Sequence, residues 1–208
     1  MTDRPILFSA PMVRALLDGR KTQTRRVLKP QPDAEFIEAT FRVGSFSMRP
    51  AYLFATETHW MLNKLPRIGD RLWVRERTHI DGNVANYAAD CDPARDLSGL
   101  GYRPSIHMPK WASRLTLVVT DVRVQRLQEI SEADAKAEGA EGYEVWAGPS
   151  SDSAGTHTSG EPEWVTPGEH FREIWRSING EDSWQANPWI AAYSFTVHRC
   201  NIDAMEAT

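Results

Sequence analysis

The sequence predicts an α+β fold built on a small β-barrel or curled sheet with helices at its flanks. Strand patterns are separated by single helix patterns without the strict regularity of βαβ units, and no strand is followed by a glycine-rich phosphate loop. The chain has 208 residues, of which 41% are hydrophobic. Because this length and composition suffice for a sizeable core, we expect one domain over residues 1–208 that folds alone.

The charge balance and the cysteine content restrict the class of protein. The net charge is −4 and the isoelectric point lies near 5.9, which disfavours a general grip on long nucleic acid and favours a small or single-stranded ligand. Cys91 and Cys200 lie far apart in the chain, and the first residues lack a signal-peptide pattern. We therefore expect a reducing cytoplasm, no membrane span and a monomer.

A cationic cluster follows the first predicted helix. Ser9 can cap a helix over residues 9–18, Pro11 fits its first turn and Gly19 ends it. Residues 19–26 then read Gly-Arg-Lys-Thr-Gln-Thr-Arg-Arg. These groups can either run acyl chemistry or hold a phosphate, and they project from a fixed point.

Alternation predicts a strand after the turn at Gly69-Asp70. One face of this strand carries Leu72, Val74, Glu76 and Thr78, and the other carries Trp73, Arg75 and Arg77. Glu76 therefore shares a face with two aliphatic side chains, where desolvation would raise its pKa.

The remaining elements are expected from periodicity and composition. We expect strands around 36–46, over 115–124 and over 189–198, helices over 130–139 with Ser131 as the cap and over 171–178, and loops or irregular hairpins over 81–109 and 147–168.

Other candidate sites are weaker. The six histidines fall in no metal-ligand spacing and the cysteines do not join them, so we expect no metal and no cofactor. Residues 107–114 combine Lys110, Trp111 and Arg114, which could form a wall of a ligand cleft or a surface turn with a cation over an indole.

The order of motifs resembles an ASCH domain of the PUA-like β-barrel superfamily, in its phage and prophage-associated branch. The resemblance spans nearly the whole chain. It rests on Leu-Phe-Ser-Ala-Pro-Met-Val at residues 7–13, on Gly-Arg-Lys-Thr-Gln-Thr-Arg at 19–25, on Gly-Asp-Arg-Leu-Trp-Val-Arg-Glu at 69–76, on Ile-Ser-Glu-Ala-Asp-Ala at 130–135 and on Tyr-Ser-Phe-Thr-Val at 193–197.

The resemblance implies a cleft for a nucleotide, and one small bacterial ASCH group hydrolyses N4-acetylcytidine to cytidine and a carboxylate. The residues that match the catalytic set of that group are Lys21, Thr24 and Glu76. This chain is about twice as long as those proteins, and its segments 81–109 and 143–168 have no counterpart in them. The substrate range can therefore differ.

Amide hydrolysis needs a nucleophile, a base for its proton and an acid for the leaving amine. Thr24, Lys21 and Glu76 can fill these roles, provided that the lysine is neutral, which roughly one in a few thousand is at pH 7 without a pKa shift. Burial and the arginines at 20, 25 and 26 would lower the pKa of Lys21, whereas a close pair with Glu76 would oppose the shifts of both groups. Alternatively, Lys21 and Glu76 activate a water that Thr24 orients.

Three functions follow from these residues. The first is a metal-independent amidohydrolase that acts on N4-acylcytidines, the second a module that binds RNA or a modified nucleotide without catalysis, and the third a ribonuclease. In each case the expected ligand contacts are Arg25, Arg26, Trp73, Arg75, Trp111 and Arg114.

Overall fold

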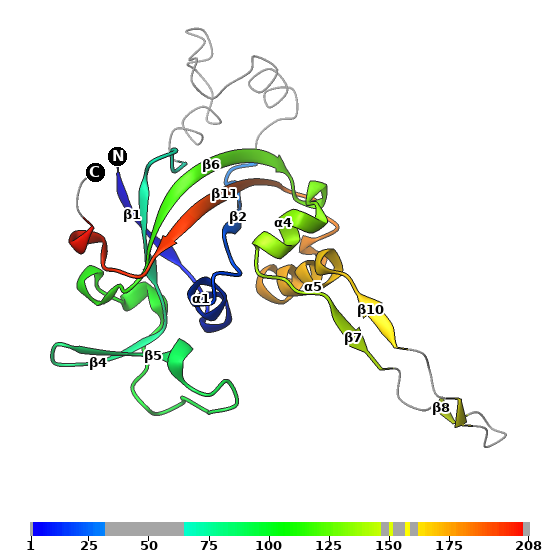
Figure 1. Ribbon diagram of the computed structural model, residues 1–208, viewed down its shortest axis with the longest axis horizontal. Coiled ribbons are helices and arrows are strands. Elements are labelled where there is room, and N and C mark those ends of the chain that lie inside the picture. The colour runs from blue at the N-terminus through cyan, green and yellow to red at the C-terminus, as the bar shows by residue number, and fades with distance from the viewer. Residues whose placement is uncertain (1, 32–64, 147–149, 152–156, 159–161, 206–208) are drawn as a thin grey trace, which may run out of the picture.

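The computed structural model describes residues 2–31, 65–146, 150–151, 157–158 and 162–205. Its centre is a five-stranded, strongly curved sheet in the order β1-β3-β6-β11-β2 (Figure 1). The strands of this sheet are β1 (Asp3–Leu7), β2 (Gln23–Val27), β3 (Arg71–Arg75), β6 (Thr116–Arg126) and β11 (Trp189–His198). Only β1 and β3 run parallel. The fold is thus α+β with a mostly β core.

The smaller elements lie outside this sheet. The helices are α1 (Ala10–Leu17), α4 (Glu132–Ala137) and α5 (Pro167–Asn179), and the short 3-10 helices are Ala88–Asp90, Ser105–His107, Lys110–Ala112, Leu127–Glu129, Glu181–Ser183 and Ile202–Ala204. The two-stranded pairs are β4 (Thr78–Asp81) with β5 (Val84–Tyr87), β7 (Tyr143–Val145) with β10 (Glu163–Val165), and β8 (Ser150–Ser151) with β9 (His157–Thr158).

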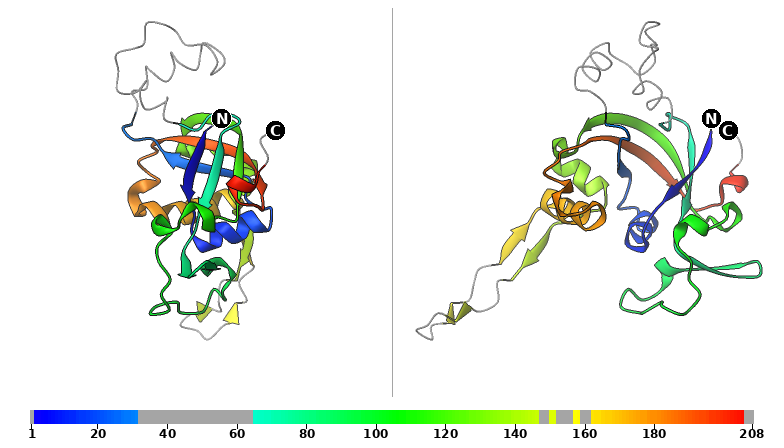
Figure 2. Two further views of the ribbon diagram at one scale, coloured as in Figure 1. Left: turned by 90° about the vertical axis from the view of Figure 1, so that its left-hand side faces the viewer. Right: turned by 180° about the vertical axis from the view of Figure 1, so that it is seen from behind.

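Alternation along β11 divides the core between two faces of the sheet. Ala191, Tyr193 and Phe195 pack in the larger hydrophobic cluster with α1, β3 and β6. Ile190 and Ala192 pack in the smaller cluster with α4 and α5. In the right view of Figure 2, these two helices lie at one end of the curved sheet and α1 lies beneath its middle. The alternation predicted for 189–198 is confirmed.

The curvature brings the two edge strands toward each other without closing the sheet. In the described residues no ladder joins β1 to β2, so the barrel that we expected is open. The Arg26 guanidinium on β2 donates a hydrogen bond of 2.7 Å to the Leu7 carbonyl on β1. The Arg26 side chain therefore connects β2 to β1, the two edge strands that backbone hydrogen bonds would join in a closed barrel.

Two predictions of local structure need correction, and a third is not tested. Ser9 occupies the cap position of α1, but its side chain forms no capping hydrogen bond. The strand predicted to continue to Thr78 ends at Arg75, because the Glu76 amide donates to the Met108 sulfur instead of a neighbouring strand. The strand expected around 36–46 lies outside the described residues.

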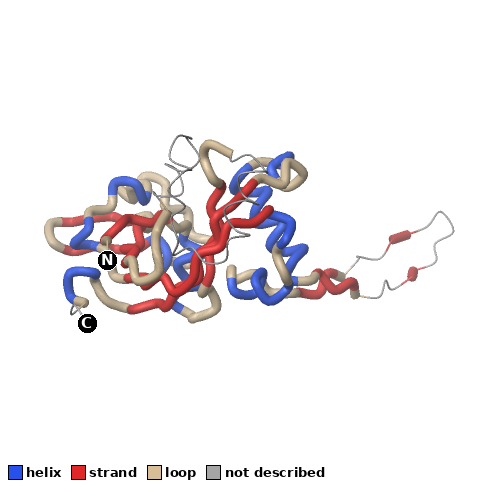
Figure 3. The backbone as a smooth tube through the Cα atoms, turned by 90° about the horizontal axis from the view of Figure 1, so that it is seen from above, coloured by secondary structure: helices blue, strands red, loops and turns tan. Residues whose placement is uncertain are grey.

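The two segments that we expected to be insertions, 81–109 and 143–168, differ in form. Residues 81–109 combine part of the β4–β5 hairpin with short 3-10 helices, as an irregular hairpin predicts. Within 143–168, β7 pairs antiparallel with β10 next to α4 and α5. Figure 3 shows this pair leading away from the main sheet. Composition alone had predicted only a loop here.

Candidate active site

Lys21 is held inside the molecule by the turn that follows α1. Gly19 ends the helix with a positive φ of 76°, and the Lys21 amide then donates to the Ala15 carbonyl at 3.0 Å. The Lys21 residue is only 1% exposed. The chain thus places a cation where water is nearly absent.

The partner of Lys21 is Glu138, at the C-terminal end of α4. The Lys21 Nζ lies 2.7 Å from Glu138 Oε2 and 2.9 Å from the Glu138 carbonyl oxygen. The second carboxylate oxygen, Oε1, lies 3.1 Å from Arg25 Nη1. Glu138 therefore bridges two cations of the 19–26 cluster. The helix ending at Gly139 could be predicted from the sequence, but nothing in it signals this contact across 117 positions.

A wider polar cluster surrounds Arg25. The Arg25 side chain is fully buried, and its Nη2 lies 3.1 Å from Asp134 Oδ2. Asp134 also accepts hydrogen bonds from Arg123 and Gln23. The Arg25 Nε has no hydrogen-bond partner in the described residues. The charge of Arg25 is thus balanced by Asp134 and Glu138, while its Nε–H group remains without an acceptor among the described residues.

Gly139 lets α4 turn directly above Lys21. Its φ is +91°, and a Cβ there would lie 3.2 Å from the Ala15 Cβ and 3.5 Å from the Lys21 Cβ. Gly139→Ala is therefore expected to lower the free energy of unfolding by about 1–2 kcal/mol from backbone strain, plus a steric cost. Gly19→Ala is the matched control, because its φ is also positive but the added Cβ meets no atom within 4 Å. Urea unfolding of both variants measures the difference, and equal losses would contradict the steric argument.

Burial and charge act against each other on Lys21. Desolvation lowers the pKa of Lys21 below 10.5, and Glu138 opposes this shift through its charge and its hydrogen bond. Arg26 and Arg25 lower this pKa further. Arg20 pairs with Asp18 and Glu141 at the surface and is not among the causes. The opposition that we expected from Glu76 thus comes from Glu138.

Glu76 lies in a second polar cluster. It is 1% exposed, and Arg114 holds it through Nε to Oε1 at 2.8 Å and Nη2 to Oε2 at 3.0 Å. Burial raises the pKa of Glu76 above 4.5, while the Arg114 hydrogen bond and charge oppose that rise. The sequence predicted the burial and the direction of the pKa shift. The arginine that binds it is one that we had expected to contact substrate.

Arg114 links Glu76 to the β4–β5 region. Its guanidinium lies 3.8 Å from the centroid of the Tyr87 ring and donates at 2.8 Å to Asp90. Both residues lie within or beside the predicted 81–109 insertion. The insertion therefore fixes the residue that holds the Glu76 carboxylate.

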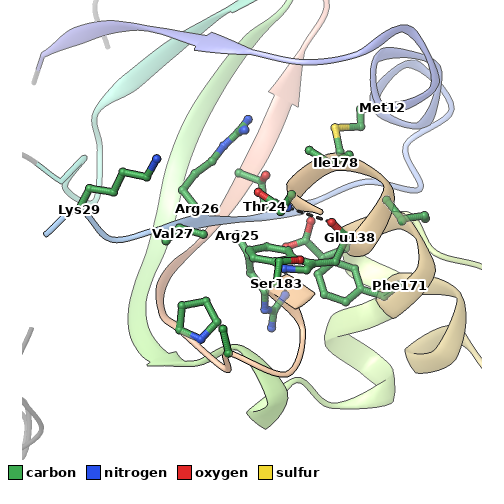
Figure 4. A pocket seen from close by; sticks show the side chains of 15 residues that line it. Met12, Thr24, Arg25, Arg26, Val27, Lys29, Glu138, Phe171, Ile178 and Ser183 are labelled. Atoms are coloured by element: carbon green, nitrogen blue, oxygen red, sulfur yellow. Dashed lines mark hydrogen bonds and ion pairs between the residues drawn. The ribbon is translucent and has the colours of Figure 1, made fainter. Parts of the chain in front are cut away.

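The structure describes a pocket of about 470 Å³ between β2 and α5, shown in Figure 4. This volume lies in the range of small-molecule sites. Its polar lining includes Thr24, Arg25, Arg26, Lys29 and Glu138. Its apolar lining is formed by Met12, Val27, Phe171, Ile174, Trp175, Ile178, Ala186 and Pro188.

The predicted site residues divide into two groups. Thr24, Arg25 and Arg26 line the pocket, and Lys21 contacts it through Glu138. Five residues are not among those that line it: Glu76, Trp73, Arg75, Trp111 and Arg114. Phe8 connects the two regions, since its ring lies 5.7 Å from Lys21 Nζ and its amide donates at 3.0 Å to the Arg75 carbonyl, one residue before Glu76.

The fold and the pocket define an α+β protein with a small-molecule-sized site, lined by a threonine, two arginines and the carboxylate Glu138, which also pairs with the buried Lys21. In the described residues, no three His, Cys, Asp or Glu side chains gather as metal ligands would. None of the helices described is both long and apolar enough to cross a membrane.

Comparison with known proteins does not identify a family for this chain. No protein-family model matches the chain, and no curated protein matches it. Among solved structures, the chain is similar to protein EF3133 from Enterococcus faecalis V583, whose description names the family-model DUF984. The TM-score is 0.43 at 14% identity, over 100% of this chain and 82% of the other.

Proposed function

We propose that this protein is an ASCH-type, metal-independent amidohydrolase that removes the acyl group from N4-acylcytidines and yields cytidine and a carboxylate. One observation carries the proposal: the buried amine of Lys21, whose pKa is lowered, is tied through Glu138 to a pocket that also contains Thr24. A lysine serves as a base only when it is neutral, and burial favours that form.

Thr24 and Lys21 are the reacting pair of the proposal. The Thr24 hydroxyl attacks the acyl carbon while Lys21 takes the hydroxyl proton, and a tetrahedral oxyanion forms. The oxyanion then collapses, the bond from carbon to N4 breaks, and N4 receives a proton. Water hydrolyses the resulting threonine ester, which releases the carboxylate and restores the hydroxyl.

The two glutamates have separate roles in this scheme. Glu76, whose pKa is raised by burial, is the proposed acid that protonates N4; because it does not line the pocket and pairs with Arg114, this role requires that the pair separate and the carboxyl move toward the substrate. Glu138 orients the Lys21 amine through the 2.7 Å hydrogen bond. We also propose that the open, curled sheet, whose edge strands Arg26 connects, is an incompletely closed PUA-like barrel. We further propose that the protein works in the cytoplasm as a monomer.

Binding without turnover is the second candidate. The Trp175 Nε1 lies in the pocket wall, is buried and has no hydrogen-bond partner in the described residues, as is true of Arg25 Nε. Unused buried donors are costly unless a ligand accepts from them. They favour a polar ligand whether or not it reacts.

Incubation with N4-acetylcytidine is expected to release cytidine at the same rate with and without a chelator. Thr24→Ala should remove this activity, while Thr24→Ser, which keeps a hydroxyl, should retain part of it. Cytidine release is followed by chromatography beside a labelled RNA. If the RNA is cut, or if the nucleoside binds without turnover, the amidohydrolase proposal fails. Full activity in Thr24→Ala would show that water, and not the Thr24 hydroxyl, is the nucleophile.

A further inference from the structure

The charges in the pocket wall are unequal. Arg25, Arg26 and Lys29 line the pocket together with one carboxylate, Glu138. That carboxylate already accepts hydrogen bonds from Lys21 and Arg25. Within the part of the chain that the structure describes, neither Arg26 nor Lys29 takes part in an ion pair. The excess of cations therefore lies with these two residues.

Arg26 is held in place without being neutralised. One guanidinium nitrogen donates to the Leu7 carbonyl, and the group lies 5.2 Å from the Phe8 ring centroid. Burial lowers the pKa of Arg26, and the charge of Glu138 offsets this only in part. Two neutral contacts thus fix a desolvated cation that an anion would stabilise.

Lys29 adds an exposed cation beside Arg26. It follows β2 by two residues, and both side chains extend to the same side of the β2 ribbon in Figure 4. The Phe171 ring lies at the other end of this view, and Thr24 lies between the two ends. The pocket thus has an aromatic end, a reactive centre and a cationic end.

We propose that Arg26 and Lys29 form a subsite for a phosphate, so that the preferred substrate is an N4-acylated cytidine 5′-monophosphate rather than the free nucleoside. The acyl group of this substrate is inferred from the proposed function, whereas the phosphate subsite is inferred from the pocket residues alone. Arginine and lysine donate charge-assisted hydrogen bonds to phosphate oxygens. The net charge of −4 favours a mononucleotide over a polymer.

Binding of four probes to the full chain tests the subsite. Isothermal titration compares cytidine 5′-monophosphate, cytidine, inorganic phosphate and a short cytidine-containing single-stranded RNA at low and high salt. The mononucleotide is expected to bind about tenfold more tightly than cytidine, with an advantage that shrinks in high salt. Equal affinity for cytidine, equal affinity for phosphate alone, or stronger binding of the RNA would each overturn the inference.

Kinetics then separate this inference from the proposed function. The measured quantity is the ratio of kcat/KM for N4-acetylcytidine 5′-monophosphate to that for N4-acetylcytidine, expected to be about tenfold. Lys29→Gln should reduce this ratio toward one, whereas Lys136→Gln, an exposed lysine of α4 outside the pocket lining, should leave the ratio unchanged. A ratio of one in the native protein rejects the phosphate subsite while the amidohydrolase stands. Preferential mononucleotide binding without hydrolysis rejects the amidohydrolase and leaves the subsite.

Discussion

Lys21→Met is expected to abolish hydrolysis of N4-acetylcytidine, a loss of at least about 10³-fold in kcat/KM, because it removes the amine that the proposal assigns as the base for Thr24. Methionine nearly retains the length of the side chain and removes the amine. The variant also deprives Glu138 of a 2.7 Å partner in a buried position. We therefore expect a loss of about 3 kcal/mol in the free energy of unfolding, less if Arg25 alone satisfies the carboxylate.

A double variant distinguishes lost chemistry from lost stability. Lys21→Met with Glu138→Gln removes both charges of the pair, so most of the stability should return, as measured by urea unfolding, while hydrolysis stays absent. Glu138→Gln alone should keep measurable activity, since the amine remains. Appreciable hydrolysis by Lys21→Met would refute the proposed base, and activity regained in the double variant would reduce the role of Lys21 to structure.

Glu76→Gln is expected to lower kcat by about 10²–10⁴-fold, the usual contribution of a general acid, while the glutamine still accepts a hydrogen bond from Arg114. The matched control is Asp90→Asn, which removes the other carboxylate bound to Arg114 and leaves Glu76 intact. Assay of both with N4-acetylcytidine separates the roles. A comparable loss in Asp90→Asn would mean that Glu76 acts only by holding Arg114 and the 81–109 segment.

The pH profile of kcat/KM gives a second readout for Glu76. In the proposed mechanism the reacting form has neutral Lys21 and protonated Glu76. The pKa of Lys21 is lowered from 10.5 and that of Glu76 is raised from 4.5, so both limbs of the bell should fall between these values. The rate rises with pH as Lys21 loses its proton and falls as Glu76 loses its own. Glu76→Gln should remove one limb.

Periodicity predicted the elements that position this site, because each has a local cause. The apolar repeat of α5 and the alternation of β11 were readable in sequence, and alternation placed Glu76 on the buried face. The Thr166 to Glu169 capping box places the start of α5 before Phe171, where the apolar repeat begins.

The partners of the charged groups could not be predicted. Lys21 and Glu138 are 117 positions apart, and Glu76 and Arg114 are 38 apart. The sequence shows only that an ion pair needs one basic and one acidic residue, and this chain has 24 lysines and arginines and 28 acidic residues that could combine. The pairing is decided by how α4 lies against β2, which depends on the packing of both cores.

The bridge that Glu138 makes between α4 and the turn after α1 spans the two halves of the molecule. Burial lowers the pKa of the Lys21 amine only while α4 covers it, since exposure to water would remove the desolvation that causes this shift. A partly unfolded chain would therefore carry an ordinary, fully protonated lysine and be inert. The proposed reactive amine is therefore a property of the folded protein, and any hydrolysis by this chain would report that α4 is packed against the turn after α1.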